Sequence, residues 1–214
     1  MSEGGDTTAV NRGWHSRGYL PHFEAAEILQ TVTFRLADAM PAEKLREWEA
    51  ELKLGENAGG SAGQKRRDDL RKKIEKWIDA GHGACHLRDP RIATLVQNAL
   101  LHFDGARYKL LEWAIMPNHV HVLLETSRTA ALASIVNSWK SFSARRANAI
   151  LKRKGAFWEL DYFDRFIRNE NHFFFAVRYI RENPVNAGLC KEPEDWFFGG
   201  AWYRVHGADG AKGG

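Results

Sequence analysis

The chain has 214 residues, of which 44% are hydrophobic and 12% aromatic, so it is long and apolar enough for one folded domain with a substantial core. Its 31 basic and 27 acidic residues give a net charge of +4, which permits binding to nucleic acid without demonstrating it. The two cysteines, Cys85 and Cys190, are too few for a disulfide scaffold or a four-cysteine zinc site.

The polar ends of the chain, 1–16 and 207–214, are predicted to be flexible tails around one domain over 17–206. Strands are predicted from β-branched, aromatic and alternating patterns at 29–36, 107–116 and 119–125. Helices are predicted from apolar periodicity and capping residues at 41–54, 64–80, 90–103, 129–152 and 170–183. A glycine-rich joint is expected at 57–63, and Pro184 is expected to close the last helix. This order indicates an α+β fold, an antiparallel sheet with helices packed on it.

No apolar run approaches the ~20 residues that a membrane span requires. The polar residues 1–12 also lack the apolar core of a signal peptide. We therefore expect a cytoplasmic protein with no membrane partner.

The pair His119-Val-His121 is the first candidate for chemistry. Residues two apart on a strand point to the same face, so both imidazoles project side by side, and Val120 points to the other face. Two neutral imidazoles on one rigid face can bind a divalent metal. The alternative is a pair of ordinary surface or cleft histidines.

The helix over 170–183 supplies the second candidate. Tyr179 and Asn183 are four residues apart, so their side chains are neighbours one turn apart, on a stripe shared with His172 and Phe175. A hydroxyl nucleophile would then lie beside an amide oxygen that can ligate metal. The apolar stripe expected to face the core consists of Phe173, Ala176, Val177 and Ile180.

A basic flank on the long helix and the residues after it is a candidate for contact with a nucleic-acid backbone. It consists of Lys140, Arg145, Arg146, Lys152, Arg153 and Lys154. The alternative is a solvated helix face. The segment that holds His82, Cys85 and His86 has metal-binding residue types, but Gly81 and Gly83 disfavour the helix that would bring the two histidines together.

Two longer segments resemble one known family. The segment 113–125 (WAIMPNHVHVLLE) is similar to the histidine strand of the single-tyrosine HUH transposases, and 179–189 (YIRENPVNAGL) is similar to their tyrosine helix. The resemblance is strongest to the REP-associated tyrosine transposases and extends over about 17–203. The charged helical stretch at about 41–88 is longer than the family core, and we interpret it as an insertion.

The resemblance implies an HUH, ferredoxin-like transposase fold and a metal-dependent endonuclease and strand transferase acting on single-stranded DNA. By position, Tyr179 matches the catalytic tyrosine that forms a 5′-phosphotyrosine, His119 and His121 match the metal ligands, and Asn183 matches an amide ligand. The implied cofactor is Mg²⁺ or Mn²⁺, and the implied partner is DNA with hairpin-forming palindromic repeats. A monomer or a homodimer in the cytoplasm of a bacterium, associated with the nucleoid, is expected.

Two other functions remain open from the sequence. A DNA- or RNA-binding protein on the same fold would bind without cleaving, although the chain retains both histidines and Tyr179. A metal-dependent hydrolase would need a further ligand beside the histidines, for which Glu125 and Asp161 are the nearby candidates.

Overall fold

The structure is a computed structural model of the chain. It describes residues 13–16, 21–24, 28–41, 43, 44, 46–48, 50, 51 and 60–210.

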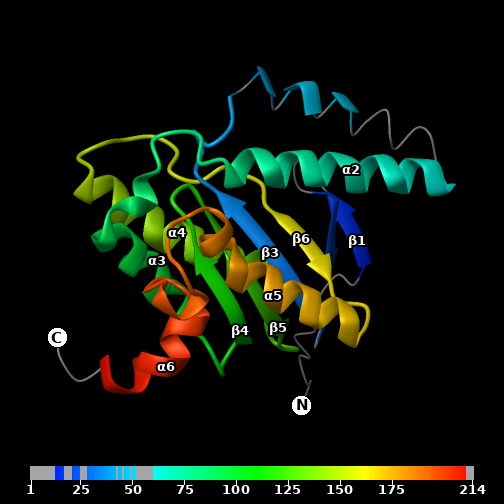
Figure 1. The fold of residues 1–214 in the computed structure, drawn as a ribbon. Coiled ribbons are helices and arrows are strands. Elements are labelled where there is room, and N and C mark those ends of the chain that lie inside the picture. The colour runs from blue at the N-terminus through cyan, green and yellow to red at the C-terminus, as the bar shows by residue number, and fades with distance from the viewer. Residues whose placement is uncertain are drawn as a thin grey trace, which may run out of the picture.

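A four-stranded antiparallel sheet in the order β4-β5-β3-β6 forms the centre of the molecule (Figure 1). Its strands are β3 (Leu29–Arg35), β4 (Tyr108–Ile115), β5 (His119–Thr126) and β6 (Phe163–Phe166). A separate two-stranded sheet pairs β1 (Gly13–Ser16) with β2 (Pro21–Glu24). Because β5 is an inner strand, both of its faces can be buried.

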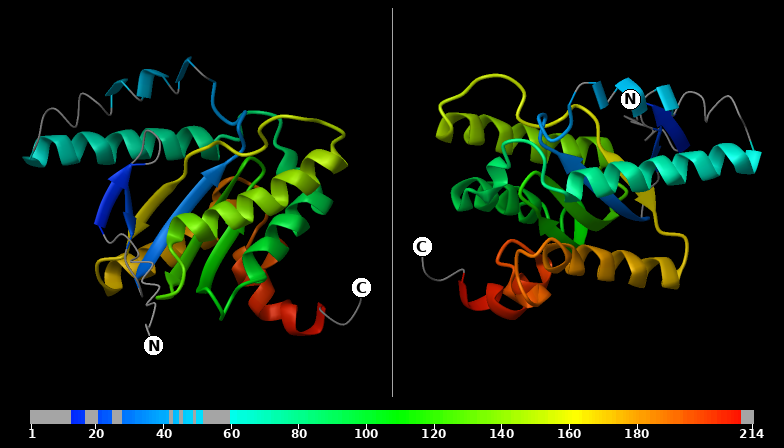
Figure 2. Two further views of the ribbon diagram at one scale, coloured as in Figure 1. Left: turned by 180° about the vertical axis from the view of Figure 1, so that it is seen from behind. Right: turned by 45° about the horizontal axis from the view of Figure 1, so that its top comes forward.

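Helices cover both faces of the central sheet (Figure 2). On one face, α3 (Pro90–Leu101) and α4 (Leu132–Ile150) pack against Val120, Val122 and Leu124 of β5. On the other, α5 (Glu170–Asn186) packs Ala176 and Ile180 against Leu123. The alternation of a strand therefore assigns even and odd positions of β5 to two separate cores.

The remaining helical elements are placed at the margins of the sheet. Helix α2 (Gly60–Asp79) crosses one end of the strands, and the 3-10 helix η1 (His86–Arg88) follows it. The 3-10 helix η2 (Pro193–Asp195) and α6 (Gly200–Gly210) lie beside β4, where Gly199 forms a bridge to Ala114. Among the described residues, no helix combines the length and apolar character needed to cross a bilayer.

A third apolar cluster attaches α2 to the domain. Leu70, Ile74 and Ile78 recur at helical spacing and are buried against Met40, Trp48 and Phe163. Trp77 adds a hydrogen bond of 3.2 Å from its ring nitrogen to the carbonyl of Ala39. The predicted insertion is thus packed onto the same body as the sheet.

The predicted α+β fold is confirmed, and so are the strands and the helices predicted at 64–80, 90–103, 129–152 and 170–183. The helix predicted at 41–54 lies partly outside the described residues. One local prediction is wrong, because α5 continues through Pro184 to Asn186. Proline removes one backbone donor and crowds the carbonyl four residues before it, yet the helix continues for two more residues, and Ala187 N bonds to Asn183 O at 3.0 Å.

The chain ends and the expected joint also differ in part from the sequence expectations. Residues 13–16 of the predicted tail form β1, and 207–210 belong to α6. The part of the expected joint that is described, 60–63, is the first turn of α2, while 1–12, 57–59 and 211–214 lie outside the described residues. The limits proposed for the domain stay a prediction.

The core on both faces of the sheet predicts that replacing two different leucines will change the free energy of unfolding by very different amounts. Leu124→Ala should lower the free energy of unfolding by about 2–5 kcal/mol, because this side chain is 0% exposed between β5 and the α3/α4 layer. Leu160→Ala should change it by less than about 0.5 kcal/mol, because Leu160 is 83% exposed. Urea denaturation followed by circular dichroism measures both, and equal effects would contradict this packing.

Candidate active site

Strand β5 holds the two predicted metal ligands on the face that α5 covers. His119 and His121 are 1% and 3% exposed, and their Nε2 atoms lie 2.9 Å apart. The strand alternation that sends Val120 into the opposite core turns both rings to this side. The expectation that the two imidazoles share one face is confirmed.

Asn118 determines which nitrogen of His119 carries the proton. The Asn118 amide nitrogen donates to the carbonyls of Ile78 at 3.1 Å and His82 at 2.9 Å, so its oxygen faces His119 Nδ1 at 2.8 Å. An amide oxygen only accepts, so His119 Nδ1 must be the donor. The Nε2 lone pair of His119 is therefore directed at the point where the two histidines meet.

Burial keeps His119 neutral. The pKa of His119 is lowered to about 4, because burial disfavours the charged imidazolium and His121 adds to this, while the Asp79 carboxylate opposes it in part. His121 is oriented by Thr33 on the neighbouring strand, whose hydroxyl lies 2.8 Å from His121 Nδ1. A neutral ring oriented from its other nitrogen is the form of histidine that binds metal.

Asp79, the last residue of α2, brings a carboxylate to the same point. Its Oδ1 lies 3.3 Å from His119 Nε2 and 3.8 Å from His121 Nε2. Partial burial raises the pKa of Asp79, but the two imidazoles lower it by more, so the carboxyl group is ionised at neutral pH. Within the described part of the chain, Asp79, His119 and His121 are the one cluster of His, Cys, Asp and Glu side chains arranged to hold a metal ion.

Asn183 completes this cluster from α5. It is 4% exposed, and its Nδ2 lies 3.3 Å from His121 Nε2, while its Oδ1 has no hydrogen-bond partner among the described residues. A half-turn of the carboxamide exchanges the two atoms and would bring the oxygen to the histidine pair. The position that the sequence proposes for an amide ligand is thus adjacent to the histidines.

The donor atoms fit a divalent cation. Two imidazole nitrogens bound at right angles to one ion, each at about 2.1 Å, are about 3 Å apart. The two Nε2 atoms lie 2.9 Å apart, and Asp79 Oδ1, like Asn183 Oδ1, is buried without a hydrogen-bond partner in the described structure. Mixed nitrogen and oxygen donors of this kind suit Mg²⁺ or Mn²⁺.

Tyr179 lies against this cluster from α5. Its ring centroid is 5.3 Å from that of His121, and its hydroxyl donates to Asp79 Oδ2 at 3.4 Å. The pKa of Tyr179 is raised well above its ordinary value, because partial burial and the carboxylates of Asp79 and Glu75 disfavour the phenolate. The side chain is nevertheless 39% exposed, so a ligand can approach its oxygen.

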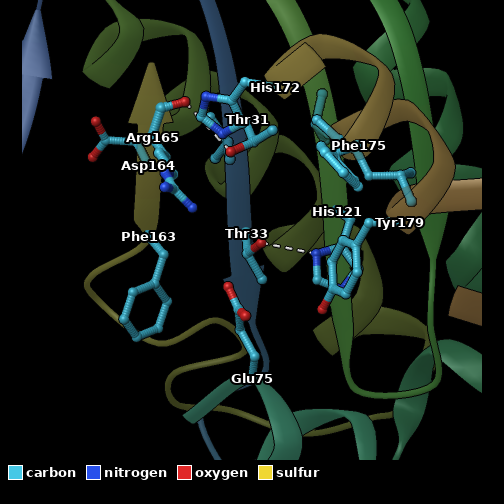
Figure 3. Close-up of a pocket in the computed structure, with 14 residues that line it drawn as sticks. Thr31, Thr33, Glu75, His121, Phe163, Asp164, Arg165, His172, Phe175 and Tyr179 are labelled. Carbon is cyan, nitrogen blue, oxygen red and sulfur yellow. Dashed lines mark hydrogen bonds between the residues drawn. The ribbon is translucent and has the colours of Figure 1, made fainter. Parts of the chain in front are cut away.

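A pocket of about 220 Å³ opens beside Tyr179 and His121 (Figure 3). Its other walls come from β3 and β6, with Thr31, Phe163 and Arg165, and from Phe175 on α5. The candidate nucleophile therefore borders a space that a substrate can occupy.

The basic residues proposed for DNA contact lie away from Tyr179, because α4 packs on the opposite face of the sheet from α5. Lys140 donates to the carbonyl of Leu160 at 2.8 Å, and burial lowers its pKa to about 8. Arg153 donates to the carbonyl of Ala156 at 3.0 Å, and the Arg146 guanidinium lies 3.9 Å from the centroid of the Phe142 ring. Contact between this flank and DNA stays a prediction.

The other candidate metal ligands do not assemble. The rings of His82 and Trp77 stack at 4.1 Å, Cys85 donates to the carbonyl of Gly81 at 3.1 Å, and His86 lies 3.1 Å from an Arg153 nitrogen. Neither Glu125 nor Asp161 belongs to the metal-type cluster in the described residues. The carboxylate beside the histidines comes instead from Asp79 at the end of α2.

The sequence reasoning missed Asp79, Asn118 and Thr33. Asp79 lies 40 residues before His119 in the chain, so no local spacing connects them. One signal was available: an acid at the carboxyl end of a helix is disfavoured by the helix dipole, and such a placement suggests another role.

Comparison with known proteins agrees with the resemblance to transposases. Residues 89–183 match the family model described as "Transposase IS200 like", a span that contains both histidines, Tyr179 and Asn183 but not Asp79. No match was found among curated proteins.

Among solved structures, the chain is similar to a REP-associated tyrosine transposase bound to a REP hairpin. The two chains are 15% identical, the match covers 88% of this chain and 84% of the other, and the TM-score is 0.51, which shows a shared fold. A putative transposase from Deinococcus radiodurans R1 is 16% identical, and the match covers 79% of this chain and 95% of the other. Its TM-score of 0.31 is too low to indicate a shared fold. The resemblance indicated by the sequence motifs is confirmed: residues 89–183 are similar to the IS200-like transposases, and the chain shares a fold with the REP-associated tyrosine transposase.

Proposed function

We propose that this protein is a metal-dependent endonuclease and strand transferase for single-stranded DNA, with Tyr179 as the nucleophile. One observation carries the proposal: the hydroxyl of Tyr179 donates to Asp79, whose other carboxylate oxygen lies 3.3 Å from His119 Nε2. A nucleophile and a candidate metal centre thus share one carboxylate. The match of residues 89–183 to the IS200-like transposase model supports the same class of reaction.

The proposed reaction is a transesterification. The phenolic oxygen of Tyr179 attacks the phosphorus of a backbone phosphodiester, and the bond from phosphorus to the 3′-oxygen breaks. The products are a 5′-phosphotyrosine and a 3′-hydroxyl, so the proton lost by the phenol is balanced by the proton gained by the 3′-oxygen. Attack by a 3′-hydroxyl on the phosphotyrosine reverses the step and joins strands without ATP.

The residues of the site have distinct tasks. A divalent cation held by His119, His121, Asp79 and Asn183 would polarise the phosphate and stabilise charge on the leaving oxygen. Asn118 and Thr33 hold the two imidazoles in orientation. Because its pKa is raised, Tyr179 keeps its proton until positive charge is close, so nucleophilic attack is coupled to occupation of the site.

The proposed substrate is DNA that folds into hairpins at palindromic repeats. The structural neighbour with the same fold is bound to a REP hairpin, and this likeness supports the same class of ligand here. The basic flank of α4 would add contacts to the DNA backbone at a distance from Tyr179. The protein would act in the bacterial cytoplasm at the nucleoid, as a monomer or a homodimer.

Covalent capture of DNA tests the nucleophile. Incubation with labelled hairpins from repeats beside its own gene, with Mn²⁺ or Mg²⁺, should give an adduct that migrates slowly on a denaturing gel. Tyr179→Phe should abolish the adduct because it removes the attacking oxygen, and EDTA should do the same. Tyr203→Phe on α6 is the matched control and should leave the adduct intact.

The other outcomes separate the remaining functions. Cleavage that survives Tyr179→Phe would indicate a hydrolase that uses the histidines without a covalent step. Binding without cleavage, across several hairpins and both metals, would indicate a non-catalytic nucleic-acid-binding protein.

Metal titration tests Asp79 without reference to cleavage. Loss of an outer partner already costs roughly 10–100-fold in metal affinity, so Asp79→Asn should weaken Mn²⁺ binding at least tenfold. Mn²⁺ should also raise the Tm of the unaltered protein more than that of the variant, because the ion binds the folded state. Electron paramagnetic resonance of free Mn²⁺ measures the affinity.

Asp69→Asn provides the control, since Asp69 is an exposed carboxylate on the same helix. It should leave Mn²⁺ affinity unchanged. Equal affinities in the unaltered protein and Asp79→Asn would show that Asp79 is not a ligand.

A further inference from the structure

The pocket beside Tyr179 has walls that suit a flat, uncharged ligand. Apolar surface comes from Phe163 on β6 and from Phe175, Ala176 and Ile180 on α5, and hydroxyl groups come from Thr31 and Thr33 on β3. Figure 3 shows Tyr179 and His121 along one side, with Phe163 across from them. Its volume of about 220 Å³ is small, so it suits one ring system and not a long chain.

Phe175 is the least expected residue in this wall. It is 70% exposed, although it lies one helical turn before Tyr179 and borders the same pocket. An exposed aromatic face at the mouth of a cavity leaves apolar surface in water until a ligand covers it. Stacking of a base on such a ring is a common mode of binding for unpaired nucleotides.

The charges around the pocket distinguish a base from a phosphate. The carboxylate of Glu75 borders it, which disfavours an anionic group inside, whereas the carboxylate of Asp164 points away from the pocket in Figure 3. The exposed Arg165 guanidinium lies at the end with Thr31 and His172, as Figure 3 shows, and makes no ion pair with any described residue. A neutral base inside the pocket, with one phosphate at the histidines and a second near Arg165, matches this distribution.

We propose that this pocket receives the unpaired nucleobase next to the phosphate that Tyr179 attacks, with Phe175 stacking on the base. The inference rests on the proposed function for the position of that phosphate. A base held in a duplex is stacked between its neighbours and cannot turn into a pocket of this size without leaving the stack. The pocket therefore makes single-stranded DNA at the cut a physical requirement.

Short oligonucleotides test the pocket separately from catalysis. The probes are the trinucleotides d(TAT), d(TCT), d(TGT) and d(TTT), which are too short to form hairpins, titrated in EDTA into ¹⁵N-labelled protein and followed by amide chemical shifts. Shifts should concentrate at Thr31, Thr33, Arg165 and Phe175. Stacking is worth roughly 1–3 kcal/mol per base, so Phe175→Ala should weaken binding about tenfold.

Phe174→Ala is the matched control. Phe174 is the neighbouring residue on α5 and is 58% exposed, but it borders a different hollow with Leu29 and Ile167. Its removal should change affinity less than twofold, and Phe175→Trp should retain binding because it preserves an aromatic face. Equal losses in both alanine variants, shifts elsewhere, or no saturable binding would overturn the proposal.

Two further outcomes keep this inference distinct from the proposed function. Trinucleotide binding that depends on Phe175, with no covalent adduct to hairpins, would support the pocket and remove the nuclease. Adduct formation that is unaffected by Phe175→Ala, or self-association that this variant abolishes in sedimentation, would overturn the pocket and assign the ring another role.

Discussion

The close approach of two imidazole nitrogens is the interaction on which this site depends. The Nε2 atoms of His119 and His121 lie 2.9 Å apart on a strand that is buried on both faces, and Asn118 directs the His119 lone pair to their meeting point. Burial keeps His119 uncharged, so His119 does not attract Asp79 or other anions as an imidazolium would. The proposed cation would lie between these two nitrogens, and the carboxylate of Asp79 and the amide of Asn183 are close enough to complete its surroundings.

Helix α2 is structurally tied to this centre. Leu70, Ile74 and Ile78 anchor α2 in an apolar cluster, and the last residue of the helix is the one whose carboxylate reaches the histidines. Asn118 strengthens the connection, because its amide donates to the carbonyls of Ile78 and His82 on either side of Asp79. The apolar packing of α2 therefore fixes the position of the Asp79 carboxylate, which a flexible loop would leave in solvent.

Local patterns in the sequence were sufficient for the fold and for the histidine and tyrosine elements, because a strand period of two and a helix period of about 3.6 fix which side chains share a face. They were insufficient for Asp79, whose partners are set by long-range packing of α2. They also did not show that α4 lies across the sheet from Tyr179, because the side on which a helix packs is a tertiary property. Pro184 shows the same limit of local patterns, because the proline does not end α5, which extends to Asn186.

Helix α5 connects the parts of the site along one line. Phe175, Tyr179 and Asn183 follow one another at four-residue intervals, which is about 6 Å of rise per step. In turn, they border the proposed base pocket, supply the proposed nucleophile and approach the histidine pair. The adjacent stripe of the helix packs Ala176 and Ile180 on the sheet. A rotation of α5 would move all three groups together, so the apolar contacts of this helix determine whether base, phosphate and phenol can be aligned at once.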